Sequence, residues 1–449
     1  MIEETGIKEF HQMERPSYGK KAVIFSIIAM GLGQIYNKQY IKGILLFAVH
    51  CFSMYMIFFQ LPHALWGLTT LGEKETRLEK VGKLYQNVLG DHSIFLMVEG
   101  LITIFILIVI ICIYVMNIKD AYQIGRLRER GKKPNTFIQT IKHVSDYCFP
   151  QLILTIPMLG VFFFTILPII FMILIGFTNY TRANMPPAHL IDWHGLKTFI
   201  DIFKIQSWSH TFFGVALWTC IWAFFATLLP FIGGYAVALL VQRQIIKFKK
   251  VWRTIFILPF AIPMFVSILI LRNMFNGQFG PINQYLGFLG ISPVPWLSDP
   301  MWAKVTLILV NFWLGFPIVM LMIIGILSTI SKDLYEAADI DGAGGLQKLR
   351  LITYPIVMQS MAPILIMSFV ANINNFNVIF LLTNGNPTNA DYQFAGKTDI
   401  LITWLYKLSM EQGQYNFASV IGVFIFLFLT VFAIYNVQRT KAFKEEDTH

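Results

Sequence analysis

Charged residues are scarce in this sequence. They account for 13% of its 449 residues, against about 25% in ordinary soluble proteins, while hydrophobic residues account for 56%. This balance excludes a soluble enzyme, a disulfide-stapled secreted domain and a disordered scaffold. The composition instead predicts a polytopic membrane protein of the cell membrane, and apolar runs of this kind cross a bilayer as helices, so the expected fold class is all-α.

Cysteine is also rare, and its positions show no C-x-x-C spacing. Three of the four cysteines lie in apolar runs, so we interpret them as small core residues and expect neither metal ligands nor a disulfide framework. No cleavable signal is expected, because residues 1–21 are polar and charged and no small-residue cleavage site follows the first apolar run. The cysteines are Cys51, Cys112, Cys148 and Cys220.

The sequence offers no nucleotide-binding motif. Its nearest approach to a phosphate-binding loop is Gly396-Lys397-Thr398, but Asp391 stands where that motif requires its first glycine. We therefore expect no catalytic residues, no metal site and no cofactor in this chain. A nucleic-acid partner is not expected either.

Acidic side chains are missing from the centres of most apolar runs. Ionisable residues inside membrane spans usually mark ion paths or proton relays. The clear cases here are His50 and Glu99, which we expect to pair with each other in a structural role. An ion-coupled carrier would have few ionisable residues in its spans with which to bind the coupling ion. We therefore expect the transported molecule to be uncharged and the energy for transport to come from outside this chain.

Eight apolar runs are long enough to cross the hydrocarbon, which takes about 20 residues. The earlier run Val23–Met30 is too short, and we interpret it as an interfacial or re-entrant segment, with a ninth span left open as an alternative. Pro259 and Pro263 interrupt the fifth run and Pro317 the sixth, which favours kinked helices around a cavity over a rigid bundle. The eight runs lie near 41–60, 93–116, 151–177, 212–241, 254–272, 304–329, 356–382 and 416–438.

Lysine and arginine predict the orientation of these spans. With the N-terminus inside, 24 of the 35 Lys and Arg residues fall in inside segments and nine in outside loops. Cytoplasmic loops carry the excess of these residues. Both termini are therefore predicted to face the cytoplasm.

The predicted cytoplasmic segment 331–355 has its own secondary structure. Asp333 followed by Glu336 matches a capping box, which predicts a short helix. The glycine-rich stretch 342–345 permits a sharp turn. A second short helix is expected to end before Pro355, because the residue before a proline disfavours the α region. The result would be a stiff helix-turn-helix that projects from two membrane helices.

This segment carries Glu-Ala-Ala at 336–338, then Gly342, then Ile352 and Pro355. The spacing resembles the EAA loop of binding-protein-dependent ABC importer permeases, whereas a helix cap alone would explain Glu336 but not the residues downstream. The resemblance implies a type I importer fold whose coupling helix seats on a cytoplasmic ATPase. The residues that would form this contact are Glu336, Ala337, Ala338, Gly342, Ile352 and Pro355.

The resemblance extends over most of 151–449 and is nearest to the larger permease subunit for maltose and maltodextrins. It is carried by Leu314-Gly-Phe-Pro-Ile318 in span six, by 368–376 in span seven, and by 383–399, which resembles the outside loop that receives the solute-binding protein. The resemblance implies that Leu314 and Gly315 contact sugar. Ile318 replaces a family tyrosine and Ala371 a family phenylalanine, which suggests a wider site for longer glucans.

Span seven supports a sugar site independently. Ser368, Asn372 and Asn375 are spaced i, i+4, i+7 and would share one helical face. Uncharged side chains that donate and accept suit sugar hydroxyls. The alternative is that the asparagines bridge helices, an interaction worth about 0.6 kcal/mol in membranes.

These observations divide the chain into an N-terminal region, 1–150, with the interfacial segment and two spans, and a permease core, 151–449, with six. The predicted function is alternating-access import of maltose or maltodextrins. The expected partners are a second homologous permease, two copies of an ATPase that binds ATP and Mg²⁺, and an extracytoplasmic sugar-binding protein. A permease for another oligosaccharide, an ion-coupled secondary carrier and a membrane scaffold remain as alternatives.

Overall fold

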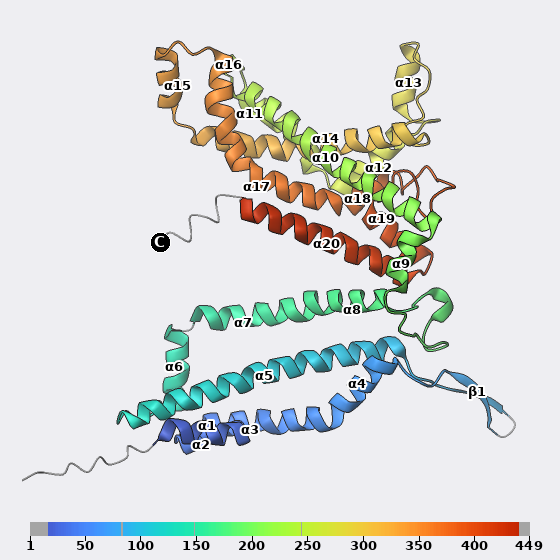
Figure 1. The fold of residues 1–449 in the computed structure, drawn as a ribbon. Coiled ribbons are helices and arrows are strands. Elements are labelled where there is room, and N and C mark those ends of the chain that lie inside the picture. The colour runs from blue at the N-terminus through green and yellow to red at the C-terminus, as the bar shows by residue number, and fades with distance from the viewer. Residues whose placement is uncertain (1–16, 82–83, 148, 244, 440–449) are drawn as a thin grey trace, which may run out of the picture. The chain divides into compact units, whose positions relative to one another are not determined.

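A computed structural model describes residues 17–81, 84–147, 149–243 and 245–439 (Figure 1). The two termini, which the sequence predicts to be cytoplasmic, lie outside these residues, as does Cys148. The chain forms two compact units, one of residues 1–174 with 183–193, the other of residues 175–182 with 194–449. The division at residue 150 remains a prediction.

Unit 1 consists of helices and one β-hairpin. The hairpin pairs β1 with β2 in antiparallel register, Arg77 opposite Val88, and was not predicted from the sequence. Its helices are α1 (Tyr18–Ile28), α2 (Leu32–Tyr36), α3 (Tyr40–Tyr55), a π-helical turn (Met56–Gln60), α4 (Leu61–Thr70), α5 (Ser93–Glu129), α6 (Phe137–Tyr147), α7 (Phe149–Val161), a second π-helical turn (Phe162–Ile166) and α8 (Leu167–Gly176), whose end enters unit 2; its strands are β1 (Arg77–Val81) and β2 (Leu84–Val88).

Unit 2 is built around α10 and α14, which pack along each other. Buried clusters of apolar side chains surround Trp222, Trp404 and Met361. The helices of the unit are α9 (Lys197–Lys204), α10 (Gln206–Gln242), α11 (Lys249–Ala261), α12 (Met264–Met274), α13 (Pro281–Phe288), α14 (Pro300–Thr329), α15 (Lys332–Ile340), α16 (Gly345–Lys348), a π-helical turn (Leu349–Thr353), α17 (Tyr354–Ile373), α18 (Phe376–Leu382), α19 (Leu401–Tyr406), a further π-helical turn (Lys407–Glu411) and α20 (Tyr415–Arg439).

The predicted spans correspond to long helices. Seven helical segments of the described chain are long and apolar enough to cross a membrane, and the bent pair α11 and α12 makes up to eight. The pair turns by 88° at the proline-rich point that the sequence marks. Ile262 is extended there, with φ −88° and ψ 134°, because the ring of Pro263 disfavours an α conformation in the residue before it. The all-α polytopic fold is confirmed.

The short apolar run near the N-terminus forms α1, which does not span. Eleven residues rise only about 16 Å. The chain then reverses at Gly31, with φ +90°, into α2, and both helices pack on α5. Buried carboxamides fix the turn: Gln34 Nε2 donates to the Asn117 carbonyl (3.0 Å), and Asn117 Oδ1 accepts from the Gly31 amide (3.2 Å).

Gly31→Ala should destabilise unit 1 by about 2 kcal/mol or more. Its positive φ costs a residue with a Cβ about 1–2 kcal/mol, and the new Cβ would overlap the Gly43 carbonyl oxygen. Gly131→Ala is a matched control, because Gly131 also has a positive φ (+75°) but no atom lies within 4 Å of an added Cβ. Thermal unfolding in detergent should show a larger drop for Gly31→Ala. Equal drops would contradict the steric argument.

The expected His50–Glu99 pair is wrong. Glu99 lies 3.9 Å from His63 Nε2, and both side chains are about half exposed. The reason is the continuation of α3 through a π-helical turn into α4, which packs along α5. His50 lies 13 residues earlier, about 20 Å along the helix, and cannot reach Glu99.

Candidate functional site

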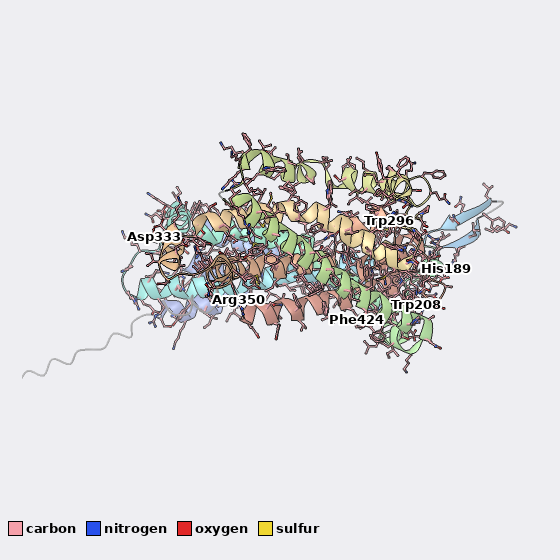
Figure 2. The ribbon with its side chains drawn as sticks, turned by 90° about the horizontal axis from the view of Figure 1, so that it is seen from above. His189, Trp208, Trp296, Asp333, Arg350 and Phe424 are labelled. Atoms are coloured by element: carbon pink, nitrogen blue, oxygen red, sulfur yellow. The ribbon has the colours of Figure 1, made fainter. Side chains whose placement is uncertain are left out.

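The segments of unit 2 that the sequence predicts to be functional lie in three places: at each end of its long helices, and at the break in span seven between these ends. Figure 1 shows α15 and α16 at one end of the long helices, and α9, α13 and α19 at the other. In the turned view of Figure 2, Asp333 and Arg350 lie at the first end, and Trp208 and Trp296 at the second. The asparagines of span seven occur between these ends, where α17 gives way to α18.

The 331–355 segment forms the predicted helix-turn-helix. Ser331, not Asp333, caps α15, and its hydroxyl accepts from the Asp333 amide (3.2 Å). Ser331 is the N-cap because its extended backbone (φ −61°, ψ 138°) leaves its side chain free to accept a hydrogen bond from the first turn of α15. Gly342 takes φ +76° in the turn, a conformation that favours glycine.

Two side-chain contacts hold the two arms of this element together. The Tyr335 hydroxyl bonds the Thr353 hydroxyl at 2.9 Å, and Lys348 forms an ion pair with Asp339. The element therefore has a defined shape without any partner.

The second arm does not end before Pro355. Residues Gly345–Ile373 form one continuous helical segment of 29 residues. A π-helical turn at Leu349–Thr353 precedes α17, and the Tyr354 amide bonds the Leu349 carbonyl five residues back. Pro355 therefore sits in the first turn of α17, a position that tolerates the missing N–H. This is why the proline does not stop the helix.

The outer surface of the helix-turn-helix is apolar with a free carboxylate. Glu336 and Ala337 are exposed, Ala338 and Ile352 are half-buried, and Glu336 has no ion pair among the described residues. Four large apolar side chains are strongly exposed nearby: Leu334 (49%), Ile340 (87%), Leu346 (78%) and Leu351 (71%). Such a cluster on a short polar loop is typical of a protein contact.

Span seven breaks between Asn374 and Asn375. Helix α17 ends at Ile373, and Asn375 caps α18, with its Oδ1 accepting from the Val378 amide at 3.4 Å. Ser368 and Asn372 share a face of α17, but the expectation that Asn375 continues this face in one helix is wrong. Asparagine is a favoured N-cap, so the polarity that suggests a site also interrupts the helix.

The asparagines form a hydrogen-bonded chain with α10. Asn375 Nδ2 donates to Asn372 Oδ1 (3.2 Å), and Asn372 Nδ2 donates to the Thr227 hydroxyl (3.1 Å). The indole of Trp222 donates to the Asn372 carbonyl at 3.0 Å. Thr227 and Trp222 were not anticipated as partners, and only the fold brings them to span seven.

The remaining predicted sugar residues reach the same helix or its core. A Cβ at Gly315 would lie 3.2 Å from two ring atoms of Pro230 on α10. Leu314 packs against the buried cluster that contains Trp222 and Val378. The Ser368 side chain is half-buried, and its hydroxyl makes no hydrogen bond to any other described residue. Leu314, Gly315 and Asn372 thus lie against α10, and Asn375 is joined to Asn372 directly.

The loop before α19 holds a buried ion pair that sequence reasoning missed. The Asp399 side chain is fully buried and lies 2.7 Å from Lys407 Nζ. It also accepts from the Gly396 amide (2.7 Å) and the Thr403 hydroxyl (2.9 Å). Burial raises the pKa of the Asp399 carboxyl above its usual range, and Lys407 and these donors oppose the rise. The only signal in the sequence was a charged pair eight residues apart.

A polar cavity of about 350 Å³ opens beside this pair. Tyr392, Phe394 and three asparagines line it. Among the described residues, Asn384 Oδ1 and Asn389 Nδ2 are buried there without a hydrogen-bond partner. The loop therefore presents unpaired carboxamide atoms at the end of unit 2 opposite the helix-turn-helix.

Comparisons with known proteins agree with this architecture. A family model, "Binding-protein-dependent transport system inner membrane component", matches residues 231–441. The galactooligosaccharides transport system permease protein GanP of Bacillus subtilis strain 168 is 40% identical over 427 residues, or 95% of this chain and 98% of that protein. The maltodextrin transport system permease protein MalC of Streptococcus pneumoniae serotype 4 is 36% identical over 447 residues, or 97% and 98%.

The fold also resembles a solved structure. A crystal structure of a bacterial ABC transporter involved in the import of the acidic polysaccharide alginate matches with a TM-score of 0.56 at 21% identity. The match covers 68% of this chain and 98% of that chain. At this identity the likeness concerns the fold alone.

Proposed function

Because this chain belongs to the binding-protein-dependent ABC transporter permeases, multi-pass inner membrane proteins that do no catalysis themselves, we propose that it imports oligosaccharides by alternating access. A separate ATPase subunit hydrolyses the ATP that drives import, and a binding protein delivers the sugar. A second homologous permease completes the pathway in this proposal. Both termini, in keeping with the lysine and arginine distribution, face the cytoplasm.

The observation that carries this proposal is the continuous helix from Gly345 to Ile373. One end joins the exposed apolar surface around Glu336, which suits an ATPase. The other end stops at Asn372, Asn374 and Asn375, which offer uncharged donors and acceptors suited to sugar hydroxyls. The proposed ATPase contact and the proposed sugar contact therefore lie at the two ends of one continuous helical segment.

Maltose and maltodextrins are the proposed cargo, with galactooligosaccharides as the second candidate. The 36% identical maltodextrin permease and the motifs of spans six and seven favour the first, and the 40% identical galactooligosaccharide permease favours the second. Ala371, where an aromatic residue was expected, is exposed beside Asn372. Less aromatic stacking surface suits a wider site for longer chains of either sugar.

The test is a sugar screen on the assembled transporter. The chain is purified with its co-eluting ATPase and reconstituted with the binding protein, and ATP hydrolysis is measured with each sugar. Stimulation by maltodextrins but not by galactooligosaccharides supports the first candidate, and the reverse supports the second. Uptake by this chain alone in liposomes with an ion gradient would overturn the proposal in favour of a secondary carrier.

Asn375→Ser should reduce sugar flux several-fold with little loss of stability. Serine also caps helices well, so α18 keeps its first turn, but the carboxamide that would bond sugar is gone. A hydrogen bond is worth about 0.5–1.5 kcal/mol, which is roughly two- to twelvefold in flux. Uptake and thermal unfolding are measured on the same preparations.

Thr227→Val is the control for this experiment. It removes the hydroxyl that accepts from Asn372 and so weakens the bridge between α10 and α17, but it leaves both asparagines in place. We expect near-normal flux from Thr227→Val. If Asn375→Ser transports normally, the asparagines only bridge helices.

A further inference from the structure

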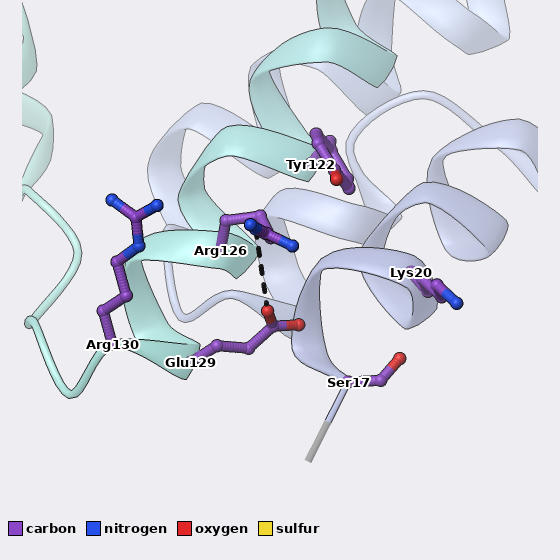
Figure 3. Close-up of a pocket in the computed structure, with 6 residues that line it drawn as sticks. All are labelled: Ser17, Lys20, Tyr122, Arg126, Glu129 and Arg130. Atoms are coloured by element: carbon purple, nitrogen blue, oxygen red, sulfur yellow. Dashed lines mark ion pairs between the residues drawn. The ribbon is translucent and has the colours of Figure 1, made fainter. Parts of the chain in front are cut away.

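A basic cavity of about 290 Å³ lies in unit 1, where α1 begins and α5 ends (Figure 3). Its lining consists of Ser17, Lys20, Tyr122, Arg126, Glu129 and Arg130. In Figure 3, Arg126 and Glu129 lie in the middle of this lining, with Lys20 on one side and Arg130 on the other. The residues are far apart in sequence, so the cavity exists only because α1 packs on α5.

A close helix crossing builds the cavity. At Gly125 an added Cβ would meet the backbone of Gly19 at 2.5 Å, so the two helices touch at paired glycines. One turn further, Glu129 Oε1 accepts from the Gly19 amide at 2.8 Å. This bond anchors the start of α1 to the end of α5 and places Lys20 beside the cavity.

The lining has an excess of positive charge. Three cations, Lys20, Arg126 and Arg130, face a single carboxylate, Glu129. That carboxylate is already engaged by the Gly19 amide and, at 3.9 Å, by Arg126. Within the described residues, Lys20 and Arg130 have no acidic partner. An anion would therefore find uncompensated donors here.

The neighbouring surface of α1 is apolar. Ile24 (57%), Ile27 (53%) and Ile28 (65%) are exposed on this helix, which is too short to span. An exposed apolar surface next to a cationic cavity matches a molecule with acyl chains and a phosphate, whereas free phosphate would leave the apolar surface uncovered. Basic pockets between membrane helices bind phospholipid head groups in this way.

We propose that this cavity binds the phosphate of an anionic glycerophospholipid, with Arg126, Arg130 and Lys20 as its ligands and α1 against its acyl chains. Tyr122 and Arg126 are four residues apart and share one face of α5, and Arg130, the residue that caps the end of α5, lines the same cavity. Arginine suits this role because its planar fork binds phosphate oxygens in pairs. The site would hold this basic end of α5 at the anionic surface of the bilayer.

The test is lipid retention by the full chain. The purified protein is mixed with phosphatidylglycerol or cardiolipin in detergent, and bound lipid is counted by native mass spectrometry. Lys20→Gln with Arg130→Gln removes two cations that make no contact with described acidic residues, so the fold should persist. At about 1 kcal/mol for each of the two cations, retention should fall roughly 30-fold. Phosphatidylcholine should not be retained by either protein.

The matched control is Lys132→Gln with Lys133→Gln. It removes the same number of positive charges just after the end of α5, from residues that do not line the cavity. Retention by this control should stay within about twofold of the unaltered chain. Equal losses in both variants, or none in either, would overturn the site. Displacement of the lipid by millimolar inorganic phosphate would show a free-anion site and would also overturn the lipid assignment.

Discussion

Glu336→Ala is expected to abolish most sugar-stimulated ATP hydrolysis while the chain inserts and assembles in the membrane normally. Its carboxylate is exposed and forms no ion pair with any residue that the structure describes, so its loss should leave unit 2 intact. If it meets a cation on the ATPase, truncation leaves that cation buried without a partner, at about 2–5 kcal/mol. That corresponds to roughly 30-fold or more in affinity. Co-purification of the ATPase and transport are the measurements.

Asp341→Ala supplies the comparison for Glu336. It removes one carboxylate from the same exposed loop, at the end of α15 rather than within the Glu-Ala-Ala stretch. We expect the ATPase to co-purify with this variant as with the unaltered chain. A similar loss from both variants would point to general charge effects, and normal co-purification of Glu336→Ala would refute the docking role.

Lys407→Met is expected to destabilise the outer loop of unit 2 strongly, by about 3–5 kcal/mol. It leaves Asp399 fully buried without its cation, held only by Gly396 and Thr403. Unfolding is followed by tryptophan fluorescence, because the indoles of Trp218 and Trp404 both donate to carbonyls of this loop. The double variant Asp399→Asn with Lys407→Met should recover much of the loss, since no charge remains buried.

The destabilisation of Lys407→Met should grow with pH. Burial raises the folded-state pKa of Asp399 above its ordinary value of 3.8, and loss of Lys407 removes an opposing influence. The folded state then binds the proton more tightly than the unfolded state, so stability is retained at low pH and is lost as pH rises through the folded pKa. The deficit relative to the unaltered chain should be smaller at pH 5 than at pH 8. The opposite trend would show that Asp399 is stabilised as a carboxylate without Lys407.

The sequence was most informative where one physical constraint decides the structure. The need for apolar length marked the spans, and the ring of Pro263 placed the sharp bend. It failed where two constraints compete. Pro355 was expected to stop a helix, but a π-helical turn places it where no N–H is required. Asn375 satisfied helical periodicity and N-cap preference equally, and the cap prevailed.

Contacts between segments that are far apart in the sequence could not be predicted from it. The Asn372–Thr227 bond joins residues 145 apart, and periodicity within α17 says nothing about what packs against it. The same holds for the Gly19–Glu129 bond, which creates the basic cavity. Residue types pointed to polar sites in the membrane, but only packing selected the partners.

The unbroken segment from Gly345 to Ile373 has a mechanical consequence. At 1.5 Å per residue it is about 40 Å long, and in the proposed transport cycle the ATPase would move the end beside Glu336. Because the helix is interrupted at Asn374 before α18 begins, we expect a movement of α17 during the proposed transport cycle to strain the hydrogen bond between the Asn372 and Asn375 carboxamides.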